Sequence, residues 1–367
     1  MTHSASSDDQ STKVFSPIDL GALHLNNRVA MAPLTRNRAG EDGVPSELHE
    51  EYYSQRASAG MIITEGVYPV RRSRGFVGQP GIENHAQQEG WRKVARAVHS
   101  RGGHIVMQIM HAGRMSHPDL TGGMQPEAPS AIAPGTEIHL ADGKQPIPTP
   151  RELAHEDIAG VVREFAAAAR RAVDAGLDGV EIHGANGYLL HEFLSPSSNR
   201  RTDEYGGAAG NRARLTIEVV RAVAEEIGAE RTGLRLSPEH NIQGVIENDR
   251  ADVLATYGAV LEGLDDLPLA FYSLLHRELD GDVIRHLRGI TDRPVLLNSG
   301  FAQYTDLDEA RYIIDELQAD GVVVGRQLIA NPDLVERWKT GAALNEADEA
   351  TFYTPSAKGY TDYPFAP

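Results

Sequence analysis

Short apolar runs rich in β-branched residues recur along the chain, and segments with helical periodicity separate them. Alternation of this kind is typical of a parallel sheet built from βα units. Several runs, such as GVEI, PVLL and GVVV, suit strands that are buried on both faces. We predict eight strands, at residues 27–34, 61–68, 104–111, 179–185, 232–238, 269–275, 294–300 and 321–327.

Eight repeats of this unit favour a closed (β/α)8 barrel, or TIM barrel, over a doubly wound sheet. A doubly wound sheet that binds a dinucleotide is expected to carry a Gly-rich fingerprint after its first strand. The chain contains neither G-x-G-x-x-G nor G-x-x-x-x-G-K-[ST]. Its 367 residues leave room for a barrel of about 250 residues with insertions. We therefore predict an α/β fold with one barrel domain over residues 14–367.

The segment 112–151 interrupts the repeat, because it holds many Gly and Pro residues and shows no helical period. Roughly forty residues is long for a plain connection. A segment that follows the third strand lies at the C-terminal face of a barrel, where active sites form. We interpret it as a capping excursion that shapes a substrate pocket.

Residues 1–13 are polar and rich in Ser and Asp, which predicts a disordered tail rather than a signal peptide. No run approaches the roughly 18 apolar residues of a membrane helix. The formal charge of −17 disfavours binding to nucleic acid or anionic lipid. We expect a cytoplasmic protein, monomeric or weakly homo-oligomeric, that acts on small molecules.

The chain has no cysteine, which excludes disulfides, thiolate nucleophiles and iron–sulfur clusters. Redox chemistry would therefore need a bound organic cofactor. The 15 histidines show no H-E-x-x-H and no compact spacing with carboxylates, so we predict no catalytic metal.

Polar residues and glycines gather at the C-terminal ends of the predicted strands, where barrel enzymes carry their catalytic residues. Each has an ordinary structural explanation when it is taken alone, but a barrel makes these ends converge. Glycines after the last two strands fit a phosphate site built from backbone N–H groups, which implies a phosphate-bearing cofactor. The residues concerned are Thr35, Gly66, Gln108, His111, His183, Asn186, Arg235, Gly300, Gly325 and Arg326.

Six runs of the sequence resemble the Old Yellow Enzyme family of FMN oxidoreductases. The most specific is HGANGYLLHEFLSPSSNRRTDEYGG at 183–207. The others are NRVAMAPLTRNRA at 27–39, IITEG ending at Gly66, VMQIMHAGR at 106–114, GVVVGRQLIANPDLVERW at 321–338 and GYTDYP at 359–364. The resemblance covers nearly the whole chain from Phe15 onward.

The resemblance implies an FMN site. The backbone of Pro33 and Leu34 and the hydroxyl of Thr35 would contact the flavin, and Gly66 would leave room for its ring. Gln108 would bond the pyrimidine edge, and Arg235 would place positive charge beside N1 and C2=O. The phosphate would be held by backbone groups at Gly300, Phe301, Gly325 and Arg326.

The resemblance also implies an ene-reductase reaction. NADPH or NADH would reduce FMN, and the flavin would pass a hydride to the β-carbon of an α,β-unsaturated carbonyl or nitro compound. His183 and Asn186 match the pair that bonds the substrate oxygen, and Tyr188 matches the donor of the α-proton. Two fixed donors at that oxygen would stabilise the developing enolate.

Three further residues are expected to line the substrate pocket. Met110 stands where many family members have a Trp, and Phe76 stands where a Tyr is frequent. Tyr353 belongs to an aromatic C-terminal stretch that we expect to pack on the barrel.

Two alternatives remain open. The same flavin site could serve nitroaromatic or nitrate-ester reduction, which needs a hydride but no proton from Tyr188. A flavin-free aldolase or isomerase could also use the phosphate loops, although the eight predicted strands contain no Lys for a Schiff base.

Overall fold

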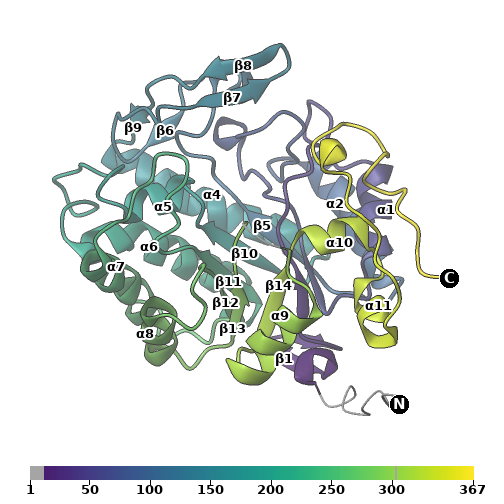
Figure 1. The fold of residues 1–367 in the computed structure, drawn as a ribbon. Coiled ribbons are helices and arrows are strands. Elements are labelled where there is room, and N and C mark those ends of the chain that lie inside the picture. The colour runs from purple at the N-terminus through teal and green to yellow at the C-terminus, as the bar shows by residue number, and fades with distance from the viewer. Residues whose placement is uncertain (1–11, 302–303) are drawn as a thin grey trace.

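Eight parallel strands form a closed barrel in the computed structural model, which describes residues 12–301 and 304–367 (Figure 1). Each predicted strand contains one of them, so the predicted TIM barrel is confirmed. In their order around the barrel the strands are β10 (Gly179–Gly184), β11 (Thr232–Leu236), β12 (Phe271–Leu275), β13 (Val295–Asn298), β14 (Gly321–Val324), β3 (Val29–Met31), β4 (Met61–Ile63) and β5 (Ile105–Ile109).

Helices surround the barrel, and their buried residues recur every three or four positions, as in α2, where Trp91, Val94 and Val98 face the core. Asn84 caps α2 by accepting a hydrogen bond from the backbone N–H of Gln87. The α-helices outside the segment after β5 are α1 (Glu47–Gln55), α2 (His85–His99), α4 (His155–Asp174), α5 (Leu189–Leu194), α6 (Ala209–Ile227), α7 (Arg250–Glu262), α8 (Asp282–Ile290), α9 (Leu307–Arg311), α10 (Arg326–Ala330) and α11 (Leu334–Thr340). Short 3-10 or π turns lie at Lys13–Phe15, Arg71–Ser73, Ala229–Arg231, Tyr312–Glu316 and Glu349–Thr351.

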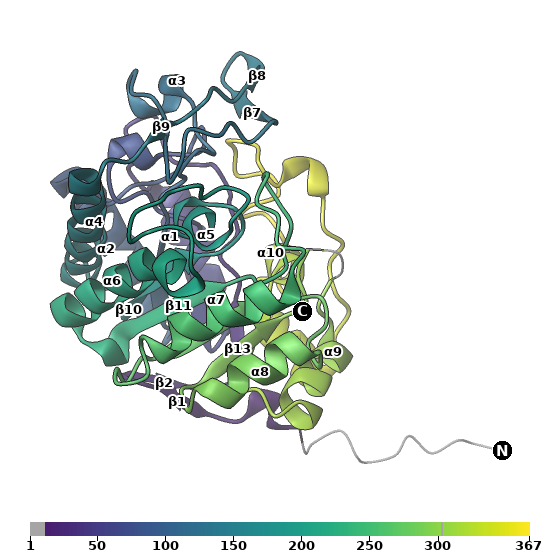
Figure 2. The same ribbon diagram turned by 90° about the vertical axis from the view of Figure 1, so that its left-hand side faces the viewer.

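A hairpin of β1 (Ile18–Leu20) and β2 (Leu23–Leu25) closes the N-terminal end of the barrel (Figure 2). Its leucines pack against inward-facing residues of the strands, among them Met61 and Phe271. The opposite end is therefore the one that can open to a ligand.

The segment after β5 contains a short helix, α3 (Pro118–Thr121), and four short strands. Strands β7 (Glu137–Leu140) and β8 (Gly143–Pro146) form an antiparallel hairpin that projects beyond the barrel, and β6 (Glu127–Ala128) pairs with β9 (Arg151–Glu152). Ile138 and Leu140 of β7 belong to the same apolar cluster as Met110 and Tyr188. A lid function for this segment stays a prediction.

The C-terminal segment packs on the barrel, as expected from its aromatic residues. Tyr360 is fully buried, and its ring stacks on Tyr52 with 3.9 Å between the ring centroids. Arg36 and Arg38 donate hydrogen bonds to backbone carbonyls of this segment, including that of Phe352. These buried arginines tie the segment to the loop after β3.

Residues 1–11 of the predicted tail lie outside the described residues. At its end, the Thr12 hydroxyl and the Lys13 backbone N–H both donate to the carboxylate of Asp315. In the described part of the chain, no helix is long and apolar enough to span a bilayer.

Candidate functional site

Four buried polar side chains meet inside the barrel, on β5, β10, β11 and β12. They are Gln108, Glu181, Arg235 and Ser273. Gln108 Nε2 donates to Glu181 Oε1 at 2.7 Å, and Arg235 Nη1 donates to Ser273 Oγ at 2.8 Å. The strand register explains the meeting, because Gln108 lies opposite Glu181 and Arg235 lies opposite Ser273. Two predicted cofactor residues thus belong to one polar cluster.

Several buried polar atoms in and beside this cluster have no hydrogen-bond partner among the described residues. They are Arg235 Nε, Glu181 Oε2, His183 Nδ1 and Asn186 Oδ1. Each such group costs about 1–3 kcal/mol if nothing pairs with it. A ligand with donors and acceptors along a flat edge would supply partners, and the pyrimidine edge of a flavin has that character. The residues present therefore fit the predicted cofactor.

The loops after β3 and β4 lie against each other through the buried carboxylate of Glu65. Its Oε2 accepts hydrogen bonds from the backbone N–H groups of Arg36 at 3.1 Å and Asn37 at 3.2 Å. These bonds hold the residues that directly follow Thr35 beside the residue that directly precedes Gly66. The two predicted flavin contacts are thereby brought to the same end of the barrel.

Gly66 has no room for a larger side chain, and the reason is a neighbouring residue. A Cβ atom built on Gly66 would lie 2.7 Å from Met110 Sδ and 3.1 Å from Met110 Cβ. Both distances are shorter than ordinary van der Waals contact. The side chain of Met110 thus occupies the space that an alanine at position 66 would need.

We expect Gly66→Ala to lower the free energy of unfolding by about 1–3 kcal/mol, because an overpacked core side chain must shift. Urea unfolding followed by circular dichroism measures this loss. Gly210→Ala is the matched control, since a Cβ at Gly210, near the start of α6, meets nothing within 4 Å. Equal stability of Gly66→Ala and the parent would show that Met110 does not fill the space beside Gly66.

His183, Asn186 and Tyr188 lie at the C-terminal end of β10. The rings of His183 and Tyr188 are 5.1 Å apart between centroids. Asn186 adopts a left-handed backbone conformation with φ 58°, its N–H donates to Ser237 Oγ and its carbonyl accepts from Gln243 Nε2, both at 2.9 Å. The structure thus brings together the three residues predicted to carry the chemistry.

The protonation states of this group follow from burial. Burial and the nearby charge of Arg235 hold the pKa of His183 well below its ordinary value. The imidazole is therefore neutral at neutral pH. Burial raises the pKa of Tyr188 to about 12, with a contribution from Tyr353 that a hydrogen bond from Gln243 opposes. Tyr188 therefore keeps its proton at every physiological pH.

The predicted pocket residues surround Tyr188. The ring of Phe76 meets Tyr188 edge-on with centroids 6.2 Å apart, and Met110 is buried in the same apolar cluster. Tyr353 is 65% exposed, and the C-terminal segment carries it to the same region, close enough to affect the pKa of Tyr188. One wall of the site is therefore apolar and aromatic.

The C-terminal ends of β13 and β14 are tied together beside the predicted phosphate site. Asn298 Nδ2 donates to the carbonyl of Val323 at 2.7 Å, and the N–H of Gly300 donates to Asn298 Oδ1 at 3.2 Å. A Cβ on Gly325 would lie 3.7 Å from Leu34 Cδ2, so this loop also adjoins the predicted flavin contacts after β3.

Two residues of the predicted phosphate site, Arg326 and Phe301, have side chains that contact other aromatic or imidazole rings. The guanidinium of Arg326 lies over the ring of Tyr304, 5.3 Å from its centroid. Phe301 is 46% exposed and packs edge-on against His240. Phosphate binding by this region stays a prediction.

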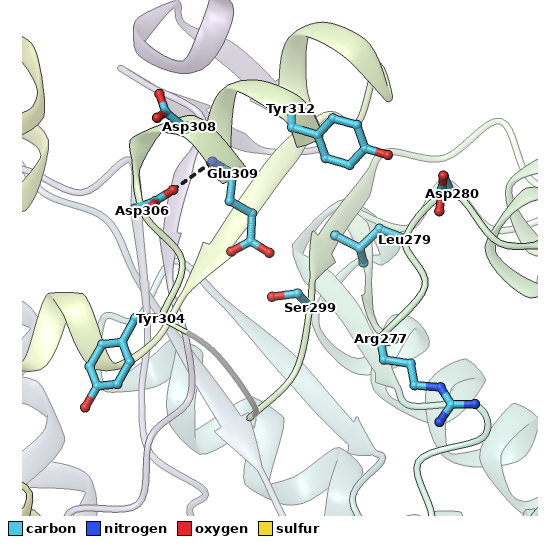
Figure 3. Close-up of a pocket in the computed structure, with 9 residues that line it drawn as sticks. All are labelled: Arg277, Leu279, Asp280, Ser299, Tyr304, Asp306, Asp308, Glu309 and Tyr312. Carbon is cyan, nitrogen blue, oxygen red and sulfur yellow. Dashed lines mark hydrogen bonds between the residues drawn. The ribbon is translucent and has the colours of Figure 1, made fainter.

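A pocket of about 420 Å³ lies beside the loop after β13 (Figure 3). Its lining is acidic, and Asp306 is the N-cap of α9, where it accepts a hydrogen bond from the N–H of Glu309. Carboxylates repel phosphate, so this pocket does not suit the phosphate of FMN. It is lined by Arg277, Leu279, Asp280, Ser299, Tyr304, Asp306, Asp308, Glu309 and Tyr312. Across the residues that the structure describes, no cluster of His, Asp or Glu side chains could hold a metal ion.

The fold and the sequence are those of a known family of flavoenzymes. A sequence profile of the NADH:flavin oxidoreductase / NADH oxidase family matches residues 13–345. The chain belongs to this family. A probable flavin mononucleotide-dependent alkene reductase of Leishmania infantum is 41% identical over 363 residues, which are 96% of this chain and 97% of the relative. The 12-oxophytodienoate reductase 7 of Oryza sativa subsp. japonica is 37% identical over 386 residues, with 96% and 94% covered.

Solved structures agree with this assignment. Morphinone reductase matches with a TM-score of 0.90 and 42% identity, covering 98% of both chains. The old yellow enzyme homologue from Zymomonas mobilis has the same TM-score with 41% identity, covering 96% of this chain and 99% of the other. The predicted membership of the Old Yellow Enzyme family is confirmed, and the chain is an NAD(P)H-dependent flavin oxidoreductase with FMN as its cofactor. The flavin-free aldolase or isomerase is thereby set aside.

The structure adds residues that the sequence interpretation missed. Gln243, on the loop after β11, contacts both Asn186 and Tyr188. Gln243 belongs to no motif. Its position eight residues after Arg235, on a loop that follows a barrel strand, is the one sequence feature that could have suggested a place near the site. Glu181 was visible as an acid inside an otherwise apolar strand, GVEI, which is itself a reason to suspect a buried polar partner.

Proposed function

We propose that this oxidoreductase is an ene-reductase that reduces α,β-unsaturated carbonyl or nitro compounds with NADPH or NADH. The observation that carries the proposal is the grouping of two donor residues, His183 and Asn186, with a protonated phenol, Tyr188, beside the polar cluster of Gln108 and Arg235. Bound FMN would take a hydride from the nicotinamide and deliver it to the β-carbon of the substrate.

His183 and Asn186 would bind the oxygen of the activating group. A neutral imidazole carries one N–H, and an amide carries two, so both residues can donate to an oxygen on which negative charge develops. Asn186 is held from both sides, by Ser237 at its N–H and by Gln243 at its carbonyl. Donors that are fixed before the reaction need no reorganisation when the charge forms.

Tyr188 would donate the proton to the α-carbon. Its raised pKa of about 12 keeps the phenol protonated, and the hydrogen bond from Gln243 stabilises the phenolate that remains after transfer. The apolar cluster of Phe76, Met110 and residues of β7 would shield this step from water. The names of the relatives, an alkene reductase, a 12-oxophytodienoate reductase and morphinone reductase, support an alkene substrate.

Pro33, Leu34, Thr35, Gly66, Gln108 and Arg235 would hold the flavin ring, and Gly300, Phe301, Gly325 and Arg326 would hold its phosphate. Their placement at one end of the barrel supports this assignment. Phe76, Met110 and Tyr353 would line the substrate pocket and determine which substituents it accepts.

A comparison of substrates tests the proposal. Purified holoenzyme is supplied with NADPH or NADH and with enones, maleimides, nitroalkenes, nitroaromatics and nitrate esters, and products are identified by mass spectrometry. We expect saturated products from the enones and nitroalkenes. Turnover of nitroaromatics or nitrate esters without any reduction of C=C bonds would reject the ene-reductase in favour of the alternative reductase.

A further inference from the structure

Glu181 is a fully buried carboxylate that the proposed reaction does not use. It lies on β10 with 0% exposure, between Gln108 on β5 and Arg235 on β11. Its Oε1 accepts a hydrogen bond from Gln108 Nε2 at 2.7 Å, and the charge of Arg235 acts on the same carboxyl. Glu181 thus contacts or faces both residues that are proposed to meet the pyrimidine edge of the flavin.

The contact with Gln108 determines which end of the amide faces the cofactor. An ionised carboxylate accepts hydrogen bonds only, so the NH2 group of Gln108 must point towards Glu181. The carbonyl oxygen of Gln108 then remains free as an acceptor. The pyrimidine edge of a flavin carries one ring N–H, and an acceptor is the group that matches it.

The contact with Arg235 determines the charge beside the cofactor. Both side chains are buried, with Arg235 only 3% exposed, so water and salt screen their charges weakly. The third titratable group nearby, His183, is neutral because its pKa is held well below the ordinary range. Burial raises the pKa of Glu181, whereas the charge of Arg235 and the hydrogen bond from Gln108 favour its charged form. The ionised carboxylate offsets the positive charge that Arg235 presents.

We propose that Glu181 is a positioning residue of the flavin site, which orients the amide of Gln108 and lowers the reduction potential of bound FMN by opposing the charge of Arg235. The proposal rests on the proposed placement of FMN against Gln108 and Arg235. Two-electron reduction adds negative charge to the flavin, and a fixed carboxylate beside Gln108 and Arg235 would make that addition less favourable.

Glu181→Gln tests the charge, because the amide keeps the shape of the side chain. We expect the equilibrium constant for two-electron reduction of bound FMN to rise about tenfold, which is about 30 mV in midpoint potential. Anaerobic titration against a reference dye measures it, and fluorescence titration of FMN into apoprotein measures affinity. We expect FMN to bind about three- to tenfold more weakly, since a Gln at position 181 can accept or donate and so no longer fixes the orientation of the Gln108 amide.

Two variants control for other effects. Burial raises the pKa of Glu192 to about 8, so Glu192→Gln changes a second buried carboxyl without removing negative charge at pH 7 and should leave the potential unchanged. Glu181→Asp keeps the charge but shortens the side chain, so it should weaken FMN binding and keep the equilibrium constant within about threefold of the parent.

An unchanged potential in Glu181→Gln with FMN bound would overturn the proposal, because it would mean that the carboxyl is neutral or too distant. If Glu181→Gln retains no flavin, Glu181→Asp provides the test instead. A tenfold rise in the equilibrium constant for FMN reduction in Glu181→Asp would overturn the claim that the charge of Glu181 is responsible. Failure of the parent enzyme to reduce enones would reject the proposed function while leaving the dye titration interpretable. The two proposals therefore fail independently.

Discussion

Replacing Tyr188 by Phe is expected to slow alkene reduction by about 10² to 10⁴, the usual range for loss of a general acid. The reason is that Tyr188 is the group proposed to deliver the α-proton, and its phenol is protonated because burial raises its pKa to about 12. Nitroaromatic reduction needs the hydride but not this proton. We expect it to fall by no more than about threefold, because the phenylalanine ring keeps the packing against Phe76 and Met110.

Rapid mixing of reduced enzyme with an enone, and separately with a nitroaromatic compound, measures the two rates on the same protein. Tyr205→Phe is a matched control, since Tyr205 bonds Glu218 and its ring contacts His155. This control should change neither rate. Equal losses of both activities in Tyr188→Phe would contradict a proton-donor role and would indicate a role in binding instead.

Replacing Asn186 by Asp is expected to lower the rate of enone reduction by about 10² to 10³, as for loss of one oxyanion donor. The change is nearly isosteric, and Asp tolerates the left-handed backbone that this position adopts with φ 58°. The variant replaces an NH2 donor with an acceptor, so it repels the negative charge that develops on the substrate oxygen. We therefore expect a large loss of rate without a large loss of stability.

The rate of flavin reoxidation by an enone measures this effect, and urea unfolding checks stability. Asn84→Asp is the matched control, because Asn84 is the N-cap of α2 and Asp caps helices equally well. A rate for Asn186→Asp within threefold of the parent would show that Asn186 does not bind the reacting oxygen.

The barrel could be predicted from the sequence because strand signals are local. Each run of β-branched residues predicts a strand without reference to the rest of the chain. Eight such strands alternating with helices are compatible with few folds other than a closed barrel. The predicted strands are longer than the observed ones, as in 61–68 against Met61–Ile63. Thr64, Glu65 and Gly66 are buried but not assigned to a strand, and pairing with β5 resumes in an isolated bridge between Val67 and Ile109. Buried character therefore continues where the regular strand has ended.

The site could be predicted in part. Residues within one run, such as His183, Asn186 and Tyr188, are recognisable from their spacing, and the structure places the rings of His183 and Tyr188 5.1 Å apart between centroids. Contacts between distant segments could not be predicted, because no local sequence pattern indicates them. Gln243 reaches Asn186 across 57 positions of the chain, and the side chains of β7 reach Tyr188 from a hairpin whose fold depends on tertiary packing.

The central claim is that this barrel carries FMN and uses it to reduce an activated C=C bond. An anaerobic titration tests it most directly. The purified protein is reduced with one equivalent of NADPH or NADH, the flavin absorbance is recorded, and 2-cyclohexenone is then added. We predict that the yellow colour bleaches and returns with one equivalent of cyclohexanone formed for each flavin. Reduced flavin that stays bleached in the presence of enones, or reoxidises without a saturated product, would contradict the account.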